Sequence, residues 1–183
     1  MTRSLVRVQV RPPPNNMTIT PHLLTGAALA TTTNSPIVAF LLGFVSHFIL
    51  DAIPHVDPGT FHNIKLPGVK KEIHLETVHQ EFKPWPTWIY IFAASEFIFI
   101  WALVIILFAG KPNFGIIMIG GLGGIFVDII DNPIVRFHLK WPVFRQIDYL
   151  HHKLHYDLPA EKWYWGIPIQ IIIIGVSAWF LLK

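Results

Sequence analysis

Apolar segments separated by polar stretches dominate the chain. The five segments span about residues 18–33, 36–53, 87–109, 114–131 and 164–182. A helix that crosses the hydrocarbon core of a bilayer needs about 20 residues, with a range of roughly 17–25. The third and fifth segments meet this length readily, the second and fourth meet it at the lower limit, and the first is short. The pattern predicts an all-α fold, an integral membrane helical bundle of about five transmembrane segments.

The composition agrees with a membrane protein. Hydrophobic residues make up 52% of the 183 residues and charged residues only 14%, whereas a soluble domain carries about 25% charged residues. This balance argues against a soluble enzyme and against a disordered chain. Tryptophan and tyrosine cluster at segment ends, for example at Trp88, Trp163 and Trp165, as in the aromatic belt of a membrane protein. The chain has no cysteine, so a metal site must use histidine, carboxylates or backbone oxygen.

The two ends of the chain differ in character. Residues 1–16 contain three arginines and three consecutive prolines, and we expect a disordered basic tail there. This tail can also precede the true start at Met17, and a signal peptide cleaved after Ala30 is a further alternative. Residues 17–183 are expected to form a single membrane domain.

The basic residues predict an orientation. Most of those between the segments fall in two long loops, residues 54–86 and 132–163, whereas the opposite side has two lysines. The positive-inside rule then places both loops and the N-terminus in the cytoplasm, for a multi-pass protein of the inner (cytoplasmic) membrane. Within these loops, residues 70–82 and 144–156 are expected to lie along the interface as amphipathic helices. This placement accounts for the net charge of +3 with the lipid bilayer as partner and without nucleic acid.

The sharpest polar motif is a histidine and an aspartate four residues apart, His47 and Asp51. On a helix they share one face, about 6 Å apart. Pro54 disfavours helix at the residue before it, so His55 should lie on the turn beyond the helix. Imidazole and carboxylate at this spacing can bind a metal ion, or the carboxylate can orient the histidine. A buried hydrogen-bonded pair that holds two helices together is the structural alternative.

Three further pieces of chain bring similar groups to the same end of the predicted bundle. They supply His22, the pair Asp128 and Asp131, and the pair His151 and His155. Ionisable groups in membrane helices are costly, and they usually face inward and serve a function. The two aspartates can instead cap a helix end near water, and the later histidines can form a solvated or headgroup-facing stripe. Glu96, within the third segment, is expected to be a packed or hydrogen-bonded group rather than a catalyst.

The ordered combination of these motifs resembles a known family. The motifs are His22 with Gly26, Gly43-x-x-Ser-His47-x-x-x-Asp51-x-x-Pro54-His55, Asp128-Ile-Ile-Asp131-Asn-Pro and the His-rich run 151–155. Together they resemble the bacterial membrane-bound metal-dependent hydrolases, over most of residues 20–157. More distantly, the His-x-x-x-Asp pair looks like that of zinc-dependent phospholipase C. The resemblance implies an all-helical fold and a site built from His22, His47, Asp51, Asp128, Asp131 and one or more of the later histidines.

The sequence therefore predicts a membrane-embedded hydrolase with a divalent metal ion. A mixture of imidazoles and carboxylates suits Zn²⁺ best, with Mn²⁺ or Fe²⁺ as alternatives. The expected ligands are first His47, Asp51, His151 and His155, and then His22, His55, Asp128 and Asp131. One of the carboxylates, Asp51, Asp128 or Asp131, is expected to serve as the catalytic base. The expected substrate is a phosphoester or lipid-like molecule at the cytoplasmic membrane face.

Two other functions fit the same pattern. The first is a small non-catalytic membrane subunit or scaffold that docks on other membrane subunits, with the His/Asp cluster as a structural metal site or hydrogen-bond network. The second is a path for protons or metal ions. The sequence shows no series of acidic residues through the membrane, which counts against a path.

Overall fold

The protein is described here by a computed structural model, which covers residues 18–56, 87–131, 142–156, 158 and 162–183. Every regular element in this part of the chain is a helix, so the all-α prediction is confirmed there. The helices are α1 (Ile19–Ala30), α2 (Pro36–Asp51), α4 (Thr87–Phe108), α5 (Phe114–Asp131), α7 (Pro142–Leu154) and α8 (Trp163–Leu182). The five predicted apolar segments correspond to α1, α2, α4, α5 and α8. The predicted tail and the predicted interfacial helix 70–82 lie outside the described residues.

The ends of α2 follow from its sequence. The Ser35 hydroxyl accepts a hydrogen bond of 3.4 Å from the Val38 backbone N–H, and Pro36 occupies the first turn, where proline costs no hydrogen bond. The helix ends at Asp51, three residues before Pro54, as the restriction on residues preceding proline predicts. His55 therefore lies on the turn beyond α2.

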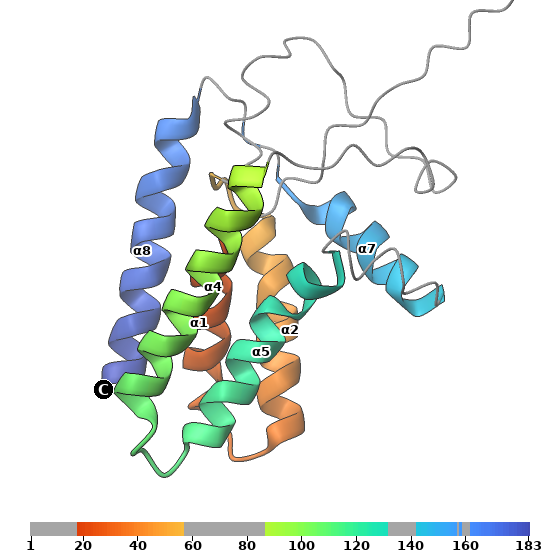
Figure 1. The fold of residues 1–183 in the computed structure, drawn as a ribbon. Helices are drawn as coiled ribbons and strands as arrows, with labels where there is room; N and C mark the ends of the chain where they lie inside the picture. Colours follow the sequence, from red (N-terminus) through yellow and green to blue (C-terminus); the bar gives the residue numbers. More distant parts are fainter. Residues whose placement is uncertain (1–17, 57–86, 132–141, 157, 159–161) are drawn as a thin grey trace, which may run out of the picture.

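Glycine allows α1, α2 and α5 to form the tightly packed centre of the bundle (Figure 1). A Cβ atom at Gly43 of α2 would collide with the carbonyl oxygen of Gly120 in α5 and would lie 2.7 Å from the backbone nitrogen of Gly124. A Cβ atom at Gly26 of α1 would likewise collide with the Gly120 carbonyl. Small residues of this kind let helix backbones approach closely. The glycine-rich fourth segment thus serves the close packing predicted for it.

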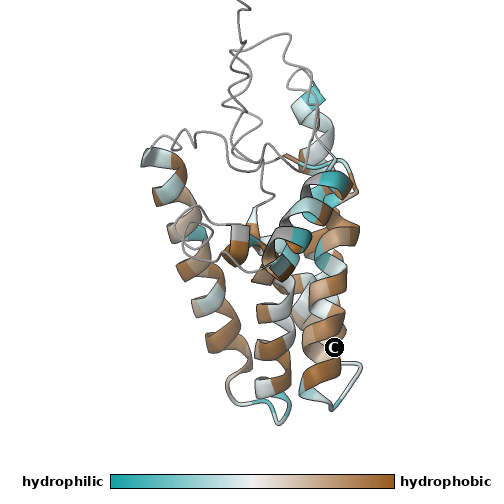
Figure 2. Ribbon diagram, turned by 90° about the vertical axis from the view of Figure 1, so that its right-hand side faces the viewer, coloured by the Kyte–Doolittle hydropathy of each residue, from teal (hydrophilic) through white to brown (hydrophobic). Residues whose placement is uncertain are grey.

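The helices α4 and α8 flank this centre and are the two described helices long and apolar enough to cross a membrane. They expose large apolar side chains, including Ile98 at 68%, Ile106 at 78% and Ile171 at 63%. Figure 2 shows hydrophobic residues along the helices and polar residues gathered near their ends. The other apolar helices, α1, α2 and α5, have 12, 16 and 18 residues.

Polar contacts fix the level of α1 against both flanking helices. The Glu96 carboxylate of α4 accepts a hydrogen bond of 2.9 Å from the Thr20 backbone N–H, which is one of the free donors at the start of α1. The prediction of a hydrogen-bonded Glu96 is therefore confirmed. On the α8 side, the hydroxyls of Thr25 and Ser177 lie 3.0 Å apart, and the Gln170 amide donates to the Thr18 hydroxyl at 3.4 Å.

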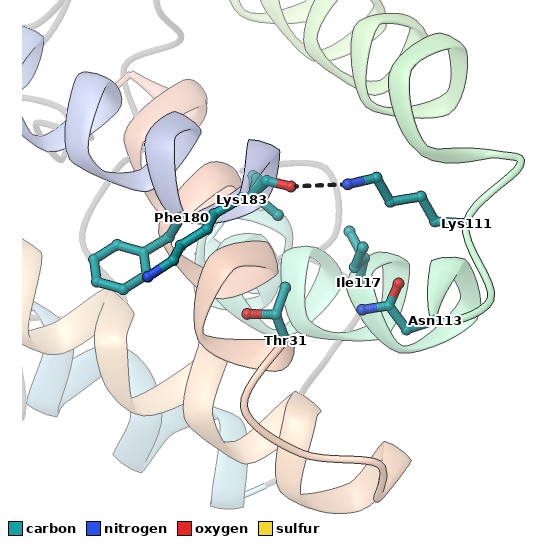
Figure 3. Close-up of a pocket in the computed structure, with 7 residues that line it drawn as sticks. Thr31, Lys111, Asn113, Ile117, Phe180 and Lys183 are labelled. Atoms are coloured by element: carbon teal, nitrogen blue, oxygen red, sulfur yellow. Dashed lines mark hydrogen bonds between the residues drawn. The ribbon is translucent and has the colours of Figure 1, made fainter.

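A shallow pocket of about 320 Å³ lies at the end of the bundle that holds the C-terminus (Figure 3). Its lining includes Thr31, Asn113 and Ile117. The Lys111 ammonium donates a hydrogen bond of 3.4 Å to the carbonyl of Leu181, in the last turn of α8, where a cation complements the free carbonyls. The histidines and aspartates of interest lie at the opposite end.

Candidate metal centre

One buried carboxylate gathers imidazoles from three helices. Asp51, in the last turn of α2, lies 3.3 Å from His22 Nε2 of α1 through its Oδ1 atom. Its Oδ2 atom lies 3.0 Å from His47 Nε2 of α2 and 2.9 Å from His151 Nε2 of α7. All four side chains are at most 1% exposed. The structure thus brings together residues that are up to 129 positions apart in the sequence.

A backbone carbonyl sets the proton position on His47. The Nδ1 atom lies 2.8 Å from the carbonyl oxygen of Gly124, and a carbonyl only accepts, so Nδ1 carries the hydrogen. In the neutral ring, Nε2 then presents a lone pair toward Asp51 Oδ2, which also presents lone pairs. Such a contact is favourable when a cation lies between the two atoms, or when His47 carries a second proton and donates it from Nε2. A backbone acceptor behind a histidine is the usual way in which proteins orient a metal ligand.

A second pair of imidazoles extends the group. His55 donates from Nδ1 to the Ile53 carbonyl at 2.7 Å, and its Nε2 atom lies 3.2 Å from His155 Nε2. The Tyr156 backbone N–H donates to the Asp51 carbonyl at 2.7 Å, which fixes the end of α7 against the end of α2. Donor atoms of Asp51, His55 and His155 all lie within 4.8 Å of one another.

The aspartates of α5 differ in what the structure describes. The Oδ2 atom of Asp128 lies 3.8 Å from His47 Nδ1, and this side chain is 10% exposed. Donor atoms of His22, His47 and Asp128 form a further group within 4.8 Å. Asp131 is the last residue of α5, and its side chain lies outside the described part of the structure. Seven of the eight predicted site residues therefore meet at one end of the bundle.

The donor geometry fits a metal ion. In a tetrahedral site with ligand distances of 2.0–2.2 Å, neighbouring donor atoms lie about 3.3–3.6 Å apart, and the separations of 2.9–3.3 Å seen here are slightly shorter. Among the described residues, His22 Nε2, His47 Nε2 and both oxygens of Asp51 find no partner in hydrogen-bond geometry despite these short distances. Short distances without hydrogen-bond geometry are expected for metal ligands, because their donor atoms point to a common centre rather than at one another.

The charges lead to the same conclusion. A proton on every imidazole around Asp51 would place three positive charges on His22, His47 and His151 in an apolar interior, which is costly. With neutral imidazoles, the buried charge of Asp51 would lack compensation, which either a single proton on one imidazole or a bound cation can supply. One divalent ion would use the same lone pairs, and Asp51 would supply part of the negative charge that balances it. The buried His and Asp groups can therefore hold a metal ion.

Backbone groups complete the site, and the sequence did not reveal them. The Gly124 carbonyl orients His47, although the glycines of this segment predicted only close helix packing. The Gln170 amide donates to the Val56 carbonyl at 2.6 Å, which holds the turn containing His55 against α8. A Cβ atom at Gly166 would lie 2.6 Å from the Val56 nitrogen, so glycine is needed for this approach. The sequence feature that could have indicated this contact is Gln170, a glutamine within an apolar segment.

Comparison of the chain with protein-family models, with curated proteins and with solved structures gave no match.

Metal content should respond to chelators and to acid. We expect protein purified in mild detergent to contain a divalent metal that a strong chelator removes, with a lower thermal unfolding midpoint as a result, because a ligand of the folded state alone stabilises that state. Acid should release the metal too, because neutral imidazoles are required as ligands. Elemental analysis across a pH series measures both effects. Purified protein whose unfolding midpoint is the same with and without chelator would contradict the expectation.

Proposed function

We propose that the protein is a metal-dependent hydrolase embedded in the cytoplasmic membrane, which cleaves a phosphoester or another ester of a lipid-like substrate. The observation that supports this most directly is the convergence of His22, His47 and His151 on Asp51, with the proton of His47 held away from it by Gly124. The resemblance of the ordered motifs to membrane-bound metal-dependent hydrolases supports the same function. We favour Zn²⁺ because the donors are imidazole nitrogens and carboxylate oxygens.

Each group has a distinct role in this proposal. The ligands are His22, His47, Asp51 and His151, and the shared position of Asp51 allows a second ion to bind with His55 and His155. A bound ion would supply water with a pKa near 7 and polarise the ester oxygen. Asp128 is the proposed base: its carboxylate accepts a proton from the attacking water. That proton then passes to the oxygen of the leaving group as the ester bond breaks.

The bilayer is the proposed environment of all five apolar helices. The exposed aliphatic and aromatic side chains of α4 and α8 support a lipid contact, because soluble monomers rarely expose such large apolar surfaces. The helix α2 also exposes an apolar row, made of Ile37, Leu41, Val45 and Ile49. The charge distribution of the sequence favours a cytoplasmic N-terminus. In this orientation the histidines lie near the cytoplasmic leaflet.

Hydrolysis is tested with metal-loaded protein in lipid vesicles. We expect release of phosphate or fatty acid from one or more members of a phospholipid panel. The variant Asp128→Asn should retain the metal and lose about 10²–10⁴-fold in rate, because it removes a general base. Wild-type protein that holds its metal and cleaves no member of the panel would reject the proposed reaction. An unchanged rate in Asp128→Asn would show that Asp128 is not the general base.

A structural metal site in a non-catalytic subunit is the second candidate. The complete burial of His22, His47 and His55 favours it, because structural sites are closed by four protein ligands whereas catalytic sites keep one position open. X-ray absorption spectroscopy of the bound metal separates the two functions. Only a catalytic site should show a light oxygen ligand that a small anion displaces.

A further inference from the structure

The helices α1 and α8 run in the same direction with one constant register. Thr25 contacts Ser177 and Thr18 contacts Gln170, and both pairs are separated by 152 residues in the chain. The same offset places His22 at the level of Ile174. Since α8 begins at Trp163, its first 11 residues rise about 16 Å above the level of His22.

Two further contacts show how far α8 and α4 extend along the bundle axis. Gln170 donates to the Val56 carbonyl, next to His55, and Gln170 lies about 10 Å below the start of α8. On the other side, Glu96 meets the start of α1 and lies about 13 Å below Thr87, the first residue of α4. Both flanking helices therefore extend well beyond the level of His22, whereas the backbone of His55 packs near the start of α8, against Gly166. Figure 1 shows α4 and α8 rising above the ends of α1 and α2.

The projecting turns are apolar and end in aromatic residues. Trp88 of α4 is 50% exposed, and Trp163 and Trp165 of α8 are 41% and 61% exposed. Such residues settle at the boundary between headgroups and hydrocarbon. The helix α8 is about 30 Å long, which equals the thickness of the hydrocarbon core. The imidazole cluster consequently extends from about 5 Å below the start of α8, where the His55 backbone packs against Gly166, to about 16 Å below it at His22.

On the side of the bundle formed by α2 and α7, the helices extend less far beyond the cluster than α4 and α8 do. The helix α2 ends at Asp51 itself, and α7 lies across the upper part of this side (Figure 1). Gln146 and Lys153 of α7 are exposed beside apolar Val143, Leu150 and Leu154. An amphipathic helix of this kind lies at the boundary between headgroups and acyl chains.

We propose that the imidazole cluster lies beneath the headgroup layer and is reached sideways from the bilayer, so that its substrate is a membrane amphiphile with its ester bond at or below the glycerol level. The substrate class rests on the proposed hydrolysis, whereas the depth rests only on the proposed placement of the helices in the bilayer. A water-soluble ester would have to pass the apolar turns of α4 and α8 or the headgroups above α7. An amphiphile already in the leaflet would meet neither barrier.

Depth is measured with single nitroxide labels, which the cysteine-free chain allows. The variants Ile49→Cys and Ile172→Cys place labels near the level of the cluster, and Trp165→Cys places one in the aromatic belt. In phosphatidylcholine vesicles we expect the first two labels to collide with dissolved oxygen in preference to a water-soluble nickel complex. The belt label should show the reverse preference. Equal access of the nickel complex to all three labels would overturn the proposed depth.

Lateral access is measured by metal removal with two chelators that share one binding group. Bathophenanthroline is uncharged and enters bilayers, and its disulfonate stays in water. We expect the disulfonate to strip the metal at least about tenfold more slowly, because charge is costly below the headgroups. Equal rates would overturn the lateral route. Protein without metal would instead reject the proposed function, while the nitroxide labels would still decide the depth.

Discussion

The variant Asp51→Asn should be purified without its metal ion. Among the described residues, Asp51 is the one side chain that contacts the imidazoles of His22, His47 and His151 together. An amide keeps the shape of the carboxylate but removes the negative charge that balances the ion, and its NH₂ group would point hydrogens at neighbouring lone pairs. Loss of a ligand in the centre of the site should cost more than the roughly 10–100-fold in affinity expected for an outer partner. Elemental analysis after gel filtration measures the loss.

The matched control for this variant is Asp128→Asn. It makes the same chemical change in a carboxylate whose nearest described imidazole nitrogen lies 3.8 Å away, so most of the metal should be retained. Circular dichroism of both proteins should show unchanged helix content. Equal metal content in Asp51→Asn and wild-type protein would remove the central carboxylate from the site.

The variant Gly124→Ala should unfold at a clearly lower temperature than the wild type. The added methyl group would collide with the carbonyl of His22, and both partners belong to helix backbones that cannot move independently. Overpacking of this kind costs about 1–3 kcal/mol, or several degrees in the unfolding midpoint of a chain of this size. The displacement of α5 away from α1 would also move the Gly124 carbonyl that orients His47. Metal affinity should therefore fall together with stability. Thermal unfolding followed by tryptophan fluorescence measures the midpoint.

The same helix provides a control. A Cβ atom at Gly115 would meet nothing within 4 Å, so Gly115→Ala should leave stability unchanged or raise it by about 0.5–1 kcal/mol, as alanine favours the helix. A similar loss of stability in both variants would mean that glycine matters for the helix itself. Only a selective loss at Gly124 supports close approach of α1 and α5.

The helices were predictable because their determinants are local. Pro36 and Pro54 bracket α2, and the apolar runs gave the positions of α4 and α8 to within a residue or two. The motif His47–Asp51 depends only on helical spacing, so its geometry followed as well. Whether α1, α2 and α5 cross the bilayer was harder to predict, since length alone does not decide whether a short apolar helix spans a membrane or packs between other helices.

The register of the helices could not be predicted from the sequence. Which turn of α8 meets α1 depends on pairs such as Thr25 with Ser177, and polar residues of this type occur at many positions in the chain. The Gly124 carbonyl was equally hidden, because every residue carries a carbonyl and only the fold decides which one faces an imidazole. These long-range details determine the depth of the cluster and the proton position on His47.

The attachment of α7 has a consequence for how the protein would behave without its ion. This helix leaves Val143, Leu150 and Leu154 exposed, and it is joined to the bundle at one end by His151, His155 and the Tyr156–Asp51 hydrogen bond. A bound metal would tie α7 to α1 and α2 through His151 and His155, so its removal would weaken the attachment of this helix. Susceptibility to a protease near residue 150 should then report directly on how much of the protein is loaded.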